Sequence, residues 1–187
     1  MTQSLICVWY EGKFQVLQHA HWNGAPTGQG LQIWKILQRP GFVTATSYGL
    51  HLSMPINDRN KCLYSADDCP SLSHKTGAAI LDMLQNATCR QILPLYLDYE
   101  FINNTQYCEH AYVVNLDGRG SFEIYVGQEP KSQAKHNRFL GFGKPEDTIP
   151  KFLISFPLDN LPETPEDFLS AVSAKLAERT TVNANLS

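Results

Sequence analysis

The sequence predicts an α+β fold, in which about three helices pack on an antiparallel sheet built from two hairpins. Two glycine-containing turns, Glu11-Gly12 and Asp117-Gly118-Arg119-Gly120, each join a pair of β-forming segments and predict these hairpins. Apolar residues at helical spacing predict three helices elsewhere in the chain. Because strands and helices follow one another in mixed order, we expect the helices to lie on the sheet of one domain.

The length and composition of the chain indicate one globular domain. It has 187 residues, of which 43% are hydrophobic and 18% are charged, and a chain of this kind buries most of its apolar surface. We expect a single domain over residues 1–179, followed by a flexible C-terminal tail over residues 180–187.

The net charge and the cysteines indicate which partners and which cellular compartment to expect. The net charge is −3 and no run of Lys or Arg is present, so neither nucleic acid nor an anionic membrane is an expected partner. No stretch reaches the roughly 18 apolar residues of a membrane span, and residues 1–4 lack the positive charge of a secretory signal. The five cysteines include no CxxC pair, which argues against a disulfide framework and a zinc knuckle. We therefore expect a soluble, cytoplasmic protein.

The first hairpin joins the segments Leu5 to Tyr10 and Phe14 to His21. A two-residue loop pairs Cys7 with Val16, and strand side chains alternate between the two faces of a sheet. One face would then carry Leu5, Cys7, Trp9, Phe14 and Val16. The other would carry Ile6, Val8, Leu17, His19 and His21. Both sets are largely apolar, so we expect this hairpin to be covered on both sides.

The first helix follows a glycine-rich turn. Apolar residues at Leu31, Trp34 and Leu37 repeat at helical spacing, and Arg39-Pro40-Gly41 ends the helix. The next segment, Phe42 to Ser53, is rich in β-forming residues and predicts one strand or two.

The middle of the chain begins with a long loop, Pro55 to Pro70. Ser73 is the expected N-cap of a second helix. The alternating segment from Gln91 to Ile102 then predicts a strand.

The C-terminal part begins with the second hairpin, which pairs Ala111 to Leu116 with Ser121 to Val126. Residues 128–151 are polar and broken by Gly and Pro, so we expect an irregular excursion there, followed by a short strand over residues 152–156. The run Thr164-Pro165-Glu166-Asp167 combines a cap, a first-turn proline and two acidic residues, and it predicts the third helix.

The candidate functional site lies at the turn from His19 to Gly30, between the first hairpin and the first helix. His19 and His21 lie two residues apart on a strand and share a face, roughly 7 Å from each other. In a hydrolase or group-transfer enzyme, His21 or His19 would act as acid/base, and Asn23 with backbone N–H groups would be the oxyanion donor. The candidates for ligand binding are Trp22, Gly24, Thr27, Gly28, Gln29 and Gly30. The sequence thus predicts that a small polar ligand binds near this turn.

Other interpretations of this turn remain open. The His-x-His pair could ligate a metal ion if a third ligand came from elsewhere in the chain. The available third ligands are His51, Asp98, Glu100, His110 and His136. No spacing selects one of them, so the sequence assigns neither a metal nor a cofactor. The glycines could cradle an anion or be purely structural. In a non-catalytic interaction module, exposed aromatic residues and residues 128–151 would meet a partner protein.

Three further residues also allow a chemical interpretation. Cys7 could be a nucleophile near the start of the chain, but its apolar neighbours favour a place in the core. Asp98 and Glu100 share a face of their predicted strand and could form an acid/base pair, although such carboxylates commonly mark the solvated side of an edge strand.

Four separate stretches of the chain together resemble the sequence pattern of one protein family. They are residues 18–30, 72–78, 108–117 and 122–127. As a set, they resemble a family of small proteins found mainly in fungi, with relatives in other microbes and in viruses. The first stretch is similar to the family pattern Gln-Trp-Asp-Gly-Tyr-Pro-x-Gly-Gln-Gly, with His21, Asn23 and Ala25 in place of Gln, Asp and Tyr. The resemblance runs from about Leu5 to Phe156 and implies the same hairpins and helices, but the family has no established activity to carry over.

Overall fold

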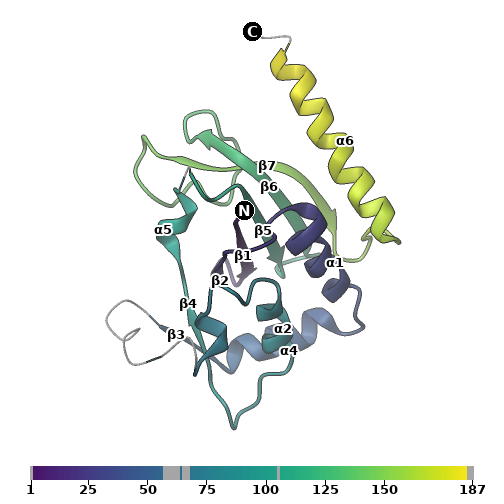
Figure 1. Cartoon of the computed structure of the whole chain (residues 1–187). Coiled ribbons are helices and arrows are strands. Elements are labelled where there is room, and N and C mark those ends of the chain that lie inside the picture. The colour runs from purple at the N-terminus through teal and green to yellow at the C-terminus, as the bar shows by residue number, and fades with distance from the viewer. Residues whose placement is uncertain (1, 57–63, 65–67, 105, 185–187) are drawn as a thin grey trace.

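A five-stranded sheet forms the centre of the molecule (Figure 1). The structure is a computed structural model and describes residues 2–56, 64, 68–104 and 106–184. The strand order is β2-β1-β5-β6-β7. These strands are β1 (Ser4–Tyr10), β2 (Lys13–Ala20), β5 (His110–Asn115), β6 (Ser121–Pro130) and β7 (Thr148–Pro157). A second, two-stranded sheet pairs β3 (Ser53–Ile56) with β4 (Leu93–Tyr96). With the helices packed on it, this architecture confirms the predicted α+β class.

The large sheet is mixed rather than purely antiparallel. Both predicted hairpins, β1–β2 and β5–β6, are present, and β7 is antiparallel to β6. However, β1 and β5 run parallel, with Ser4 opposite His110 and Trp9 opposite Asn115. The prediction of an antiparallel sheet is therefore wrong where the two hairpins meet. The chain returns along β2 to the end of the sheet where β1 began, and the segment between β2 and β5, which contains the helices, then carries it past β1 to the other side of that strand.

A β-bulge shifts the register of the first hairpin. The pairing beside the turn is as predicted, but Cys7 pairs with Leu17 rather than with Val16. One extra residue in a strand moves every later side chain to the other face. The predicted faces are therefore wrong for the second half of β2. Leu17 packs in the same cluster as Cys7, and His19 faces that side as well, against Phe101.

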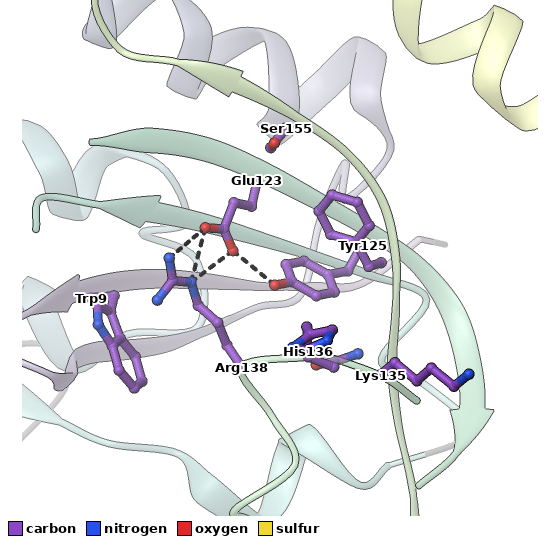
Figure 2. Close-up of a pocket in the computed structure, with 9 residues that line it drawn as sticks. Trp9, Glu123, Tyr125, Lys135, His136, Arg138 and Ser155 are labelled. Carbon is purple, nitrogen blue, oxygen red and sulfur yellow. Dashed lines mark hydrogen bonds and ion pairs between the residues drawn. The ribbon is translucent and has the colours of Figure 1, made fainter. Parts of the chain in front are cut away.

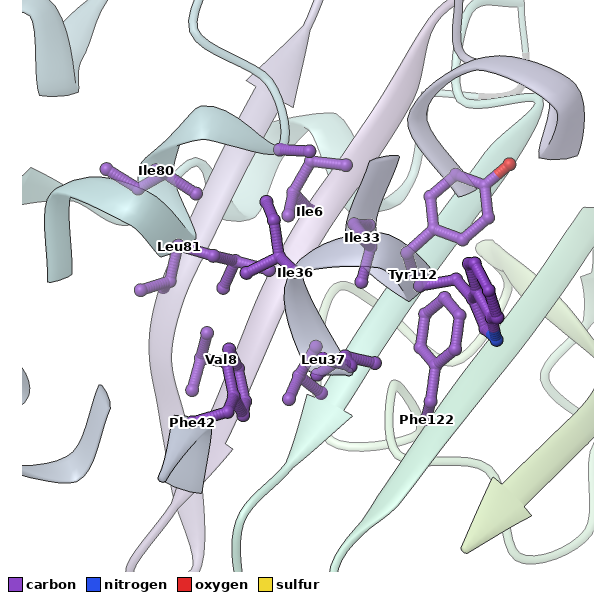
Figure 3. Close-up of a cluster of buried hydrophobic side chains, with 14 of the residues drawn as sticks. Ile6, Val8, Ile33, Ile36, Leu37, Phe42, Ile80, Leu81, Tyr112 and Phe122 are labelled. Carbon is purple, nitrogen blue, oxygen red and sulfur yellow. The ribbon is translucent and has the colours of Figure 1, made fainter. Parts of the chain in front are cut away.

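Among the described residues, four helices cover one face of the sheet. They are α1 (Leu31–Leu37), α2 (Phe42–His51), α4 (Ala79–Gln85) and α6 (Pro165–Ala184). Figure 3 shows side chains of α1, α2 and α4 packed on Ile6 and Val8 of β1 and on Tyr112 and Phe122 of the neighbouring strands. Phe168 of α6 extends the same cluster. This face holds the main hydrophobic core.

The opposite face carries a second, smaller core. It is covered by α5 (Tyr99–Ile102) and by irregular residues 131–147. Phe101 of α5 and Phe139 of the irregular segment pack in one cluster with Leu5 and Cys7 of β1. The prediction that the first hairpin is covered on both sides is confirmed.

The helix α2 occupies the place of a predicted strand. Its sequence is rich in β-forming residues, yet its buried residues Phe42, Thr46, Gly49 and Leu50 follow helical spacing. Gly49 lies against the backbone carbonyl of Leu84, where a Cβ atom would not fit. Packing of α2 on α4 thus outweighs the local preference for a strand.

Other predicted boundaries also change. The helix α4 begins at Ala79, well after the predicted N-cap Ser73, which instead follows the short 3₁₀ turn η2 (Pro70–Leu72). The predicted strand over residues 91–102 divides into β4 and α5. The predicted loop over residues 55–70 begins inside β3, and residues 57–63 and 65–67 lie outside the described residues.

The C-terminal segments follow the prediction more closely. The irregular excursion covers only residues 131–147, because β6 runs to Pro130 and β7 begins at Thr148. The hydroxyl of Thr164 accepts the N–H of Asp167 at 3.1 Å, so the predicted start of α6 is confirmed. Of the residues in the predicted tail, 180–184 are helical and belong to α6, and residues 185–187 lie outside the described residues. Among the described residues, no helix combines the length and apolar content that a membrane crossing requires.

Candidate functional site

Three histidines from two distant segments meet at the end of β2. His19 is the next-to-last residue of β2, His21 follows that strand, and His74 lies in the loop before α4. The N–H of His21 donates to the carbonyl of His74 at 2.9 Å, and the side chain of Gln18 donates to the carbonyl of Ser73 at 2.8 Å. These two bonds hold the segments together, so that one ring nitrogen of each histidine lies within 4.8 Å of the other two.

The ring of His19 is packed on several sides. Its centroid lies 4.7 Å from that of His21 and 4.5 Å from that of His74. Phe101 stacks on it at 3.6 Å, with the two planes 20° apart. His19 is only 8% exposed, whereas His74 is half-buried and His21 is exposed. The cluster therefore has one buried histidine and an open side.

Each ring nitrogen of His19 faces a different side chain. Nε2 lies 2.8 Å from Oε1 of Gln3, and Nδ1 lies 3.8 Å from Oδ2 of Asp98. The other carboxylate oxygen of Asp98 accepts the N–H of Phe101 at 3.2 Å and so caps α5. Burial, with a smaller contribution from His74 and His21, lowers the pKa of His19 to about 3. The imidazole of His19 is therefore neutral at physiological pH.

A cavity of about 460 Å³ opens beside this cluster. Its walls include His19, His21 and Asp98 together with Glu100 and Tyr107. Glu100 and Tyr107 are exposed, and Asp98 is partly buried. Asp98 and Glu100 thus share this cavity wall, although they lie at the start of a short helix rather than on the predicted strand. A polar small molecule fits a space of this size and composition.

The glycine-rich turn is packed closely against its surroundings. Gly24 lies against the backbone of Gln3, and Gly28 against Asn23, at distances where a Cβ atom would clash. Asn23 has a positive φ of 55°, and its carbonyl accepts the N–H of Gln29 at 2.8 Å. These glycines are therefore needed for close contacts within the turn and with Gln3. This supports the interpretation that they are structural.

Gln29 connects this turn to the histidine segments. Its side-chain amide donates to the carbonyl of Trp22 at 3.1 Å and accepts the N–H of Ala78 at 2.7 Å. Gly30 lies against the ring of Tyr112. The structure therefore brings His19 and His21 to the cavity, while the other predicted site residues stay outside its lining. Those residues are Trp22, Asn23, Gly24, Thr27, Gly28, Gln29 and Gly30.

The remaining candidates from the sequence lie elsewhere. Cys7 is fully buried, and burial raises the pKa of its thiol well above the usual value. His51 lies on α2 beside Tyr10, His110 begins β5, and His136 lies in the irregular segment after β6. None of these three histidines belongs to the described cluster of His19, His21 and His74.

Sequence reasoning missed His74, Gln3 and Phe101. His74 lies more than fifty residues after His21, and no local spacing joins the two. A weak signal was available, because a histidine directly after the expected helix cap Ser73 lies at the end of an element, where site residues gather.

The sequence matches no protein-family model and shows no significant similarity to curated proteins or to solved structures. The resemblance to the fungal family therefore stays a prediction, and the chemistry of the site must be argued from its own residues.

Proposed function

We propose that this protein binds a divalent transition metal ion, Zn²⁺ in the first place, through His19, His21 and His74. The observation that carries the proposal is the approach of one ring nitrogen from each histidine to within 4.8 Å of the others. Nitrogens that each lie about 2.0–2.1 Å from a tetrahedral zinc ion are roughly 3.4 Å apart. Small side-chain rotations of the exposed His21 and the half-buried His74 would bring the ring nitrogens from within 4.8 Å of one another to the distance that a zinc ion requires.

The surroundings of His19 suit a metal ligand. Metal-bound histidines commonly donate their second ring N–H to a carboxylate, which fixes the orientation of the ring. Asp98 faces Nδ1 of His19, so Nε2 is the expected ligand atom. Gln3, whose Oε1 lies 2.8 Å from Nε2, would then move aside into the cavity.

Three imidazoles leave a fourth position of a tetrahedral ion open. Zinc sites with three protein ligands hold a water molecule or a substrate there, and the metal lowers the pKa of that water to about 7. The cavity of about 460 Å³ adjoins the cluster and supplies Glu100 and Tyr107 as polar contacts. This arrangement supports the hydrolysis of, or group transfer to, a small polar substrate. The two histidines then act as ligands rather than as acid and base.

Zinc titration tests the proposal. Protein stripped with a chelator is titrated with Zn²⁺ against a coloured competing chelator, and the wild type should bind one ion per chain. The variants His21→Ala and His74→Ala should bind more weakly by well over the roughly 10- to 100-fold that loss of an outer-sphere contact causes.

The variant His51→Ala is the matched control, because His51 is also exposed but lies on α2. It should bind Zn²⁺ like the wild type. Equal zinc affinity in the wild type and in His74→Ala would refute the metal site. Zinc binding without turnover of any tested ester, amide or phosphate would restrict the protein to metal binding.

A further inference from the structure

A second cavity lies on the same face of the sheet, between β6, β7 and the irregular residues 131–147. It has a volume of about 650 Å³, which is within the usual range of small-molecule sites. Figure 2 shows Arg138 and Tyr125 converging on Glu123 at one wall, with Trp9 beside Arg138 and with Lys135 at the far end. The residues of this cavity differ from those around the three histidines.

An ion pair forms one wall of the cavity. Nε and Nη2 of Arg138 donate to the carboxylate of Glu123 at 2.6 to 2.9 Å. The hydroxyl groups of Tyr125 and Ser121 donate to the same carboxylate at 2.8 and 2.9 Å. Glu123 is buried, and its charge is balanced by Arg138. The hydrogen bonds to Glu123 leave Nη1 of Arg138 for a ligand.

The guanidinium of Arg138 is held rigidly in this position. Its Cζ atom lies 5.0 Å from the centre of the Trp9 ring, so the aromatic face and the carboxylate together fix its plane. A buried ion pair contributes little to stability compared with apolar residues of similar volume. Its presence on a cavity wall therefore points to a role in binding.

Aromatic rings and a second cation complete the site. Phe152 is 46% exposed and packs edge-on against Tyr125 at 5.5 Å. Trp9 and Phe152 both line the cavity and offer flat apolar surfaces. Lys135 adds a positive charge, while the charge of Glu123 is already neutralised. The cavity thus combines a net positive charge with flat apolar walls.

We propose that this cavity binds a small organic anion, a carboxylate or phosphate joined to an aromatic ring. The anionic group pairs with Nη1 of Arg138, and the ring lies against the exposed face of Phe152. This site is independent of the metal proposed at His19, His21 and His74.

Calorimetric titration with four probes tests this proposal. Phenyl phosphate and benzoate carry both features, inorganic phosphate carries only the charge, and phenol carries only the ring. At least one of the first two should bind saturably to the wild type and more tightly than both single-feature probes. Chemical shifts of the Trp9 indole N–H should change during the same titration.

Two exposed aromatic residues provide matched variants. Phe152→Ala should weaken binding by roughly three- to tenfold, the size expected for one aromatic contact. Tyr48→Ala, an exposed aromatic residue of α2 outside this cavity, should leave binding unchanged. Failure of both two-feature probes to bind, or equal binding by Phe152→Ala, would overturn the proposal.

Discussion

The ring of Phe101 stacks on the imidazole of His19, with the centroids 3.6 Å apart and the planes 20° apart. Phe101 is buried, and its N–H is bound by Asp98, which also faces Nδ1 of His19. One short helix, α5, therefore supplies both the packing surface and the carboxylate that orient His19. Such fixed orientation reduces the conformational entropy that metal binding would otherwise cost.

The carboxylate of Asp98 should matter for zinc more than for folding. Asp98→Asn keeps a side-chain oxygen that can cap α5, and Asn is as good an N-cap as Asp. We expect the zinc affinity to fall by roughly 10- to 100-fold and the free energy of unfolding to change by less than about 1 kcal/mol. Competitive zinc titration and urea denaturation measure the two effects. An unchanged zinc affinity would show that Asp98 does not act through His19.

The side chain of Gln29 should contribute to stability rather than to ligand binding. It is 7% exposed and joins Trp22 to Ala78 through two hydrogen bonds. Gln29→Ala leaves the buried N–H of Ala78 without this partner, so we expect a loss of about 2–4 kcal/mol in urea denaturation. Gln38→Ala removes an exposed bond to Pro162 and should cost less than about 1 kcal/mol. Similar losses in the two variants would contradict the structural role of Gln29.

The ion pair of Glu123 and Arg138 should show a characteristic double-mutant pattern. Arg138→Met leaves a buried carboxylate without its cation and should destabilise the fold by about 3 kcal/mol or more. The double variant Glu123→Leu/Arg138→Met removes both charges and should recover most of that loss. The measurement is the free energy of unfolding in urea. If the double variant lost as much stability as the two single variants together, Glu123 and Arg138 would not be energetically coupled.

The buried cysteines should resist alkylation in the folded protein. Burial raises the pKa of Cys108 to about 12 and that of Cys7 well above its usual value. A raised thiol pKa lowers the thiolate fraction at any pH below it, and the thiolate is the reactive form. With iodoacetamide at about pH 8, the exposed Cys89 should be modified first, and Cys7 and Cys108 only after unfolding. Peptide mass spectrometry identifies the sites, and early modification of Cys7 would contradict its place in the core.

Local patterns were enough to predict much of the fold. Short glycine turns fixed the two hairpins, and the run from Thr164 to Asp167 fixed the start of α6. The strand predicted at α2 is wrong because its β-branched residues favour a strand locally, whereas the helical spacing of Phe42, Thr46 and Leu50 lets one face of a helix be buried. That spacing was visible in the sequence.

Long-range relationships were beyond local patterns. The parallel pairing of β1 with β5 joins segments about a hundred residues apart. The bulge in β2 reversed the predicted facing of His19, since one added residue changes the side of every later side chain. His19 and His21 are predictable as a pair because they lie two residues apart in the sequence. His74 comes close to them only in the folded chain, where its carbonyl accepts the N–H of His21.

The zinc coordination shell tests the central claim most directly. X-ray absorption of the zinc-loaded protein should show three imidazole nitrogens, each about 2.0–2.1 Å from the metal, and one further light atom. A shell that contains sulfur at about 2.3 Å, or fewer than three imidazoles, would contradict a metal site formed by His19, His21 and His74.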